Sequence, residues 1–260
     1  MTVRQVFYQA MVAQLVEKSE KGYRKVQYAV LQLRRAGDVA YEAIVDSTRR
    51  LIQAYTSTSV AERLREAARF YRKALWDKSD CQLEIWLEKD ALAGVVEPVT
   101  DRYDVALVVA RGFSSETAVW EAAQRLLENG KPAHVFHLGD YDPSGQAAAA
   151  DIERKLRDFA PGLEITFERL AVTPEQIAAW SLPTRPTKAS DTRAGFTSAI
   201  SVELDAIDPR RLRALVQEAI ERHLPPERFV ELMSEERAER EQAMEVIDEA
   251  LSYANDDEED

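Results

Sequence analysis

Four short apolar runs, separated by amphipathic segments, constrain the fold of this chain most strongly. The runs are rich in β-branched and aromatic residues and span residues 81–87, 105–110, 133–138 and 163–170. Helical patterns lie between them at residues 115–129 and 146–159. Parallel strands need long crossover connections, which helices supply. The alternation therefore predicts an α/β fold with a mainly parallel, Rossmann-like sheet.

A different pattern precedes this region. Residues 2–18 and 23–36 place apolar side chains at helical spacing, and a polar turn separates them. Residues 39–50 have the composition of a short strand or wing. Helix, turn, basic helix and wing are the outline of a winged-helix DNA-binding domain. The alternative is a small helical cap with a solvated basic face.

The distribution of charge favours the DNA-binding interpretation. The whole chain carries a net charge of −12, but residues 1–79 hold 15 Lys and Arg against 8 Asp and Glu. Residues 230–260 hold 2 against 13. A basic segment of this kind suits the phosphate backbone of double-stranded DNA. The side chains expected to contact DNA from the second helix are Arg24, Lys25, Arg34 and Arg35.

The remaining segments complete a three-part organisation. A charged helix is predicted over residues 59–78 as a linker, a loop over 181–193, and helices over 209–223 and 226–253 before an acidic tail. The predicted parts are a winged-helix domain with its linker, an α/β domain, and a C-terminal helix with its tail, spanning residues 1–79, 80–225 and 226–260. A single cysteine, Cys81, excludes an internal disulfide. No apolar run is long enough for a membrane span, so we expect a cytoplasmic, nucleoid-associated protein.

Carboxylates follow two of the predicted strands. Glu88 comes directly after the first strand, and Asp140 and Asp142 come after the third. Ligands of open α/β sheets collect at the carboxyl ends of the strands, and oxygen ligands suit Mg²⁺. Glu88 is then placed to complete a metal site or to act as a general base. An Asx-capped turn is the alternative for either aspartate taken alone.

Three motifs carry a family resemblance. LEIWLEKDAL, VVARGFSSETAVWEAAQRL and HVFHLGDYDPSG resemble the Toprim domain of the type IIB topoisomerase (topoisomerase VI) A subunit and its meiotic double-strand-break relatives. The resemblance implies that Glu88, Asp140 and Asp142 bind Mg²⁺, with Mn²⁺ as a substitute, and act in DNA cleavage. TVRQVFYQ is similar to the motif of that family's catalytic tyrosine, which becomes joined to a DNA 5′ end. Carried over by motif, this tyrosine is Tyr8 and its assisting arginine is Arg4.

The resemblance also implies partners. The family's active site is composite, with the tyrosine of one protomer facing the metal site of the other, which implies a homodimer acting on double-stranded DNA. A separate subunit would supply the ATPase, because this chain carries no ATPase domain. Lys89 and Arg111 are expected to contact phosphate.

Two other functions stay open. One is a Toprim metal-dependent endonuclease of mobile-element or defence type, in which Tyr8 packs in the core beside Phe7. The other is a DNA-binding module without catalytic activity.

Four further polar residues have more than one interpretation. Glu203 and Asp205 follow a strand-like segment; they lie either near the metal site or, as we expect, simply at a strand-to-helix turn. His134 and His137 share one predicted strand but face opposite sides, so they do not chelate a metal together. We interpret both histidines as structural or as neighbours of the substrate.

Overall fold

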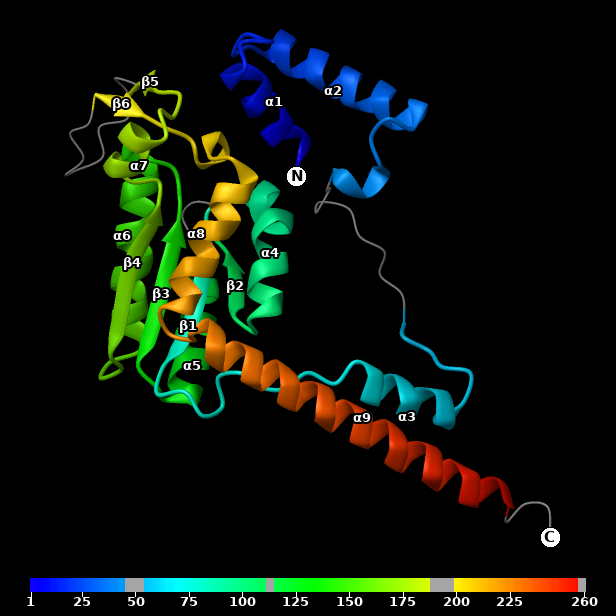
Figure 1. Ribbon diagram of the computed structural model, residues 1–260. Helices are drawn as coiled ribbons and strands as arrows, with labels where there is room; N and C mark the ends of the chain where they lie inside the picture. The colour runs from blue at the N-terminus through cyan, green and yellow to red at the C-terminus, as the bar shows by residue number, and fades with distance from the viewer. Residues whose placement is uncertain (45–53, 111–114, 188–198, 257–260) are drawn as a thin grey trace. The chain divides into compact units, whose positions relative to one another are not determined.

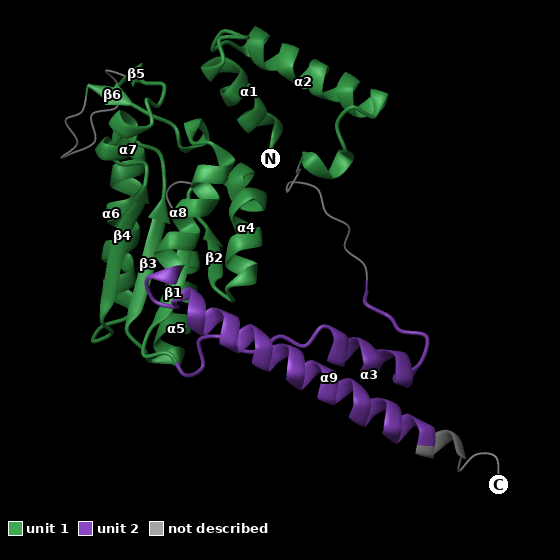
Figure 2. Ribbon diagram, in the orientation of Figure 1, with its two compact units in different colours: residues 1–49, 79–220 green, residues 50–78, 221–260 purple. Residues whose placement is uncertain are grey.

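The computed structural model describes residues 1–44, 54–110, 115–187 and 199–256. The contacts within the chain divide it into two compact units. Unit 1 holds residues 1–49 and 79–220, and unit 2 holds residues 50–78 and 221–260 (Figure 2). This grouping differs from the predicted parts 1–79, 80–225 and 226–260 because α1 contacts η3 in unit 1 and α3 packs on α9 in unit 2.

A four-stranded parallel sheet forms the centre of unit 1 (Figure 1). Its strands are β1 (Gln82–Leu87), β2 (Ala106–Val109), β3 (Ala133–Leu138) and β4 (Ile165–Ala171). They stand in the order β2-β1-β3-β4, and every pair is parallel. The α/β prediction with a parallel sheet is confirmed, and each predicted strand is present within two residues of its expected ends.

Helices connect the strands. The three crossovers are α4 (Ala93–Arg102), α5 (Glu116–Asn129) and α6 (Pro143–Phe159). Pattern reading found α5 and α6 but missed α4, which contains Pro98 and has a weak apolar stripe. Side chains of α5 and α6 pack with β1 and β3 into a core that includes Trp86, Val135 and Ile152.

Two capped helices begin the chain. α1 (Val3–Val12) starts with a capping box between Thr2 and Gln5, and α2 (Glu20–Ala36) starts with the Ser19 side chain on the Gly22 N–H. Gly37 ends α2 in the left-handed conformation, as its position predicts. The helices pack on each other through a buried cluster of Phe7, Tyr8, Val26 and Val30.

The predicted wing strand is not found where the chain is described. Residues Tyr41–Ala43 form the 3-10 helix η1 instead, and residues 45–53 lie outside the described residues. Arg34 holds this turn because it donates to the Tyr41 carbonyl and stacks on the Tyr41 ring. Two packed helices joined by a turn are therefore present, while the winged-helix assignment stays a prediction.

Short elements follow β4. They are α7 (Pro174–Ala179), β5 (Arg185–Pro186), β6 (Ile200–Ser201), the 3-10 helix η3 (Leu204–Ala206) and α8 (Pro209–Glu221). β5 lies inside the region 181–193 that was predicted as a loop, and it pairs with β6, which follows that region. Another 3-10 helix, η2 (Asp90–Leu92), follows β1.

Unit 2 is a pair of helices. α3 (Val60–Arg69) ends well before residue 78, where the linker helix was predicted to end, and it packs on α9 (Pro226–Asp256). The buried carboxylate of Glu236 explains this early end, because it accepts the Lys73 backbone N–H and pairs with Arg72 and Arg240. Among the described helices of the chain, none is long and apolar enough to cross a membrane.

His137 gives the fold a measurable pH dependence. It is buried on β3 against Phe167, and burial lowers the pKa of its imidazole to about 3. An unfolded histidine titrates near pH 6.5, so protons bind the unfolded chain preferentially and stability falls as pH drops below that value. At pH 5 this residue alone is expected to cost about 2 kcal/mol relative to pH 7. Urea unfolding of His137→Gln should show a shallower pH dependence than the wild type, and equal slopes would contradict this assignment.

Candidate active site

The carboxyl ends of β1 and β3 bring the first two acidic residues together. Glu88 follows β1 directly, and its backbone N–H donates to the Leu138 carbonyl at the end of β3 (2.9 Å). The Glu88 carboxylate turns toward β3 and accepts the backbone N–H of Asp140 through Oε2 (2.9 Å). The predicted meeting of these strand ends therefore holds.

Two glycines make room for this approach. A Cβ atom on Gly139 would lie 2.6 Å from Glu88 Oε2, and one on Gly145 would lie 2.5 Å from the Asp140 carbonyl oxygen. At Gly145 the Cβ would collide with backbone atoms, so this position needs glycine, whereas at Gly139 the ends of the Glu88 and His137 side chains would have to shift. The Gly139 and Gly145 positions thus leave a cradle around the Glu88 carboxylate and the Asp140 backbone.

Asp142 caps the N-terminus of α6. Its Oδ1 accepts the Gly145 N–H (2.8 Å), and it is the N-cap of α6 with Pro143 at the first helical position. The Asx cap is therefore present at Asp142, and metal binding by this residue stays a prediction. Its second oxygen, Oδ2, faces Arg185 at 3.8 Å.

Lys89 is the central cation of the site. Its Nζ lies 2.6 Å from Asp205 Oδ2, 2.9 Å from Asp140 Oδ1 and 3.6 Å from Glu203 Oε2. Burial would lower the pKa of Lys89, but the surrounding carboxylates outweigh burial and raise it above its ordinary value. Lys89 is thus a charged lysine bound to three carboxylates, and in this arrangement it is not a free phosphate contact.

Glu203 and Asp205 belong to the site and do not merely occupy a turn. An isolated bridge between Tyr141 and Val202 brings their segment to the end of β3, and the Leu204 N–H donates to Asp140 Oδ1 (2.7 Å). Asp205 is fully buried. Among the described residues, its Oδ1 has no hydrogen-bond partner. Our expectation for this pair was wrong because the sequence does not show the long-range bridge that carries it to Asp140.

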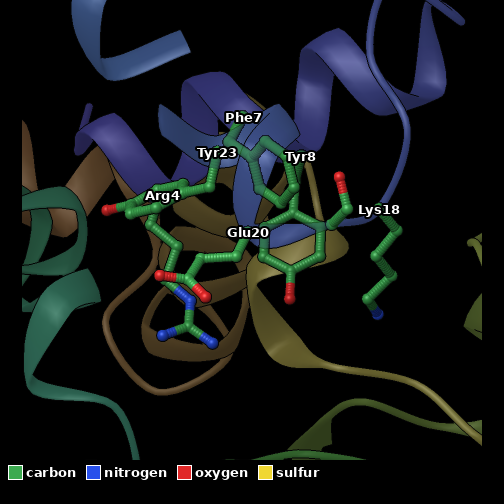
Figure 3. A pocket seen from close by; sticks show the side chains of 7 residues that line it. Arg4, Phe7, Tyr8, Lys18, Glu20 and Tyr23 are labelled. Carbon is green, nitrogen blue, oxygen red and sulfur yellow. The ribbon is translucent and has the colours of Figure 1, made fainter. Parts of the chain in front are cut away.

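Tyr8 reaches the same cluster from α1. Its ring is buried, with 3% of the residue exposed, and it packs edge-on against Phe7. Its hydroxyl donates to Glu203 Oε2. In Figure 3 this hydroxyl lies between the guanidinium of Arg4 and the ammonium of Lys18. Arg4 and Lys18 both pair with Glu203, at 3.3 and 3.4 Å.

The electrostatics of the cluster follow from these contacts. Burial and the hydrogen bond to Glu203 raise the pKa of Tyr8. Burial alone would raise the pKa of Glu203, but the hydrogen bond from Tyr8 and the charges of Lys89, Lys18 and Arg185 lower it to about 2. Burial and the neighbouring charge of Asp140 raise the pKa of Glu88. Near neutral pH the site therefore combines a protonated phenol, Tyr8, with an ionised carboxylate, Glu203.

Two arginines that sequence analysis did not select also support the site. Arg169, on β4, donates to the backbone carbonyls of Gly139, Asp140 and Val172 and so fixes the turn that carries Asp140. Arg185, on β5, pairs with Glu203 Oε1 at 2.8 Å. Neither lies in a motif, and only the pairing of distant strands places them here.

Of the residues predicted to contact DNA, Lys89 is part of this cluster, whereas those on α2 have other surroundings. On α2, Lys25 and Arg35 are exposed, whereas Arg24 pairs with Glu20 and Arg34 is bound to Tyr41. Arg111 lies outside the described residues.

The donor set fits Mg²⁺. Glu88, Asp140 and Asp142 supply only oxygen ligands, and the two glycines let the Glu88 carboxylate lie close beside the Asp140 backbone. Within the described residues, no oxygens of these three side chains all lie within 4.8 Å of one another. Since Mg²⁺ is commonly held by one or two carboxylates and several waters, three direct ligands are not required.

Comparison with known proteins adds no assignment. No protein-family model matches the chain, and no curated protein matches it.

Removing the charge of Lys89 tests this description of the site. Lys89→Met leaves buried carboxylates without their cation, which typically costs 3–5 kcal/mol of stability. The exposed Lys21→Met is the matched control and should change stability by less than about 0.5 kcal/mol. Chemical denaturation measures both variants, and a Lys89→Met protein as stable as the control would contradict the ion-pair network.

Proposed function

We propose that this protein is a Mg²⁺-dependent DNA-cleaving enzyme of the Toprim type, similar to the topoisomerase VI A subunit. The observation that carries the proposal is the contact of the Tyr8 hydroxyl with the acidic edge of the sheet, through Glu203 and Lys89. The predicted active-site residues come from separate sequence motifs, but all of them belong to unit 1 of the fold. They lie at positions 4, 8, 88, 140 and 142.

The proposed reaction is a transesterification. The Tyr8 oxygen attacks a DNA phosphorus, a Tyr8–phosphate bond to the 5′ end forms, and the bond to the 3′ oxygen breaks. The phenol proton passes to solvent, and the 3′ oxygen takes a proton as it leaves. Arg4 stabilises the charge that develops on phosphate. Bound by Glu88, Asp140 and Asp142, Mg²⁺ would polarise the phosphoryl oxygens.

Partners follow from the same proposal. Double-stranded DNA is the substrate, and a homodimer would place two sites on opposite strands. Tyr8 contacts Glu203 of its own chain, so each site would use its own tyrosine, unlike the composite site that the resemblance implies. Strand passage would need a separate ATPase subunit.

One observation favours a second function. Tyr8 is nearly fully buried against Phe7, as a purely structural tyrosine would be. In that case the protein is a Toprim endonuclease that hydrolyses DNA with the metal alone. Burial and its hydrogen bond also hold Tyr8 protonated, so the tyrosine mechanism requires the contact to Glu203 to open when DNA binds.

Plasmid cleavage separates these functions. Supercoiled plasmid is incubated with Mg²⁺ or Mn²⁺, quenched with SDS and run on gels with and without proteinase K. For the tyrosine mechanism we expect the wild type to produce DNA with protein-linked 5′ ends. Tyr8→Phe and Asp140→Asn should lose this product. The control Tyr28→Phe should retain it, because the Tyr28 side chain is exposed on α2. Free ends that persist in Tyr8→Phe but not in Asp140→Asn would instead establish the endonuclease. Binding without cleavage under every condition would contradict both.

A further inference from the structure

The carboxylate of Glu203 lies inside a shell of cations. Oε1 is 2.8 Å from Arg185 and 3.4 Å from Lys18. Oε2 is 3.3 Å from Arg4 and 3.6 Å from Lys89, and it also accepts the Tyr8 hydroxyl. Four cations and a phenol therefore converge on one carboxylate; Arg4 and Tyr8 come from α1, and the other three groups come from separate segments of the chain.

This arrangement exceeds what a structural glutamate needs. A single buried carboxylate is balanced by one cation, whereas four surround Glu203. Three of these four also have other partners: Lys89 pairs with Asp140 and Asp205, Arg4 pairs with Asp205, and Arg185 pairs with Asp142. Lys18 and Arg185 contribute further positive charge to the same point. Without Glu203 the position would attract an anion strongly.

The chemistry of the shell suits a phosphodiester. Transfer to Tyr8 requires its hydroxyl to contact the phosphate while cations hold the remaining oxygens. Glu203 Oε2 occupies the place next to that hydroxyl, and Arg4 and Lys18 flank it. The carboxylate therefore stands where the group attacked by Tyr8 would lie.

A cavity adjoins this place, because three of the residues that line it, Arg4, Tyr8 and Lys18, contact Glu203. It has a volume of about 350 Å³ and is lined by Arg4, Phe7, Tyr8, Lys18, Ser19, Glu20 and Tyr23 (Figure 3). The side chains of Arg4 and Lys18 are 50% and 42% exposed, so an anion can reach them from solvent.

We propose that Arg4, Lys18, Lys89 and Arg185 form a phosphodiester-binding site next to Tyr8, in which the Glu203 carboxylate competes with the DNA phosphate. DNA binds when its phosphate displaces Glu203, and the same step frees the Tyr8 hydroxyl. The identity of the phosphodiester as DNA rests on the proposed function, whereas the binding of phosphate at this site does not.

Duplex binding tests the competition directly. Affinity is measured by fluorescence anisotropy in EDTA, so that cleavage does not contribute, for wild type, Glu203→Gln and Glu128→Gln. The two variants lose the same charge, but Glu128 is exposed on α5, away from the cluster. We expect Glu203→Gln to bind about tenfold more tightly than Glu128→Gln, equivalent to about 1.4 kcal/mol. Equal or weaker binding would overturn the proposal.

Inorganic phosphate tests the site without DNA. Gln at position 203 still accepts the Tyr8 hydrogen bond, and circular dichroism verifies the fold of each variant. Phosphate should raise the melting temperature of Glu203→Gln more than that of the wild type, and Arg185→Gln in the same background should remove the gain. An equal effect of phosphate on wild type and Glu203→Gln would contradict the site.

The two proposals fail in different ways. Tight anion binding by Glu203→Gln with intact plasmid in every cleavage assay leaves this site standing and overturns DNA cleavage. Cleavage by the wild type that is lost in Glu203→Gln, without any gain in duplex affinity, overturns competition and identifies Glu203 as the base that accepts the Tyr8 proton.

Discussion

The ion pairs of Lys89 are the interaction on which the rest of the site depends. Its ammonium group joins Asp140, at the end of β3, to Asp205 and Glu203 around η3. Three carboxylates this close would repel one another, and their desolvation costs several kcal/mol unless a cation offsets it. The fold supplies that cation from the end of β1, one residue beyond Glu88. The parallel sheet thus has a chemical consequence, because it aligns the ends of β1 and β3.

Glu203 links this acidic edge to the N-terminal helices. It binds Lys89 on one side and the Tyr8 hydroxyl and Arg4 on the other. Within unit 1, the contact of α1 with η3 is therefore made in part by ion pairs and by the hydrogen bond of Tyr8. An interface held by ion pairs responds to an incoming polyanion, which a purely apolar interface would not do. This property fits the phosphodiester substrate that we propose.

Local patterns predicted the sheet, but not the second half of the site. Strand ends are visible in sequence because apolar runs stop there, so Glu88 and Asp140 were found. Glu203 and Asp205 reach Asp140 through the bridge between Tyr141 and Val202, which connects residues far apart in sequence. α4 was missed because Pro98 interrupts its pattern. The contacts of Arg169 likewise depend on tertiary packing that periodicity does not encode.

The most direct test of the central claim is to identify the residue joined to DNA. Protein trapped on radiolabelled duplex with Mg²⁺ is digested with nuclease and trypsin, and the modified peptide is sequenced by mass spectrometry. The account predicts a nucleotide on the tryptic peptide Gln5–Lys18, whose single tyrosine is Tyr8. A nucleotide on any other peptide, or cleaved DNA without a covalent adduct, would contradict Tyr8 as the nucleophile.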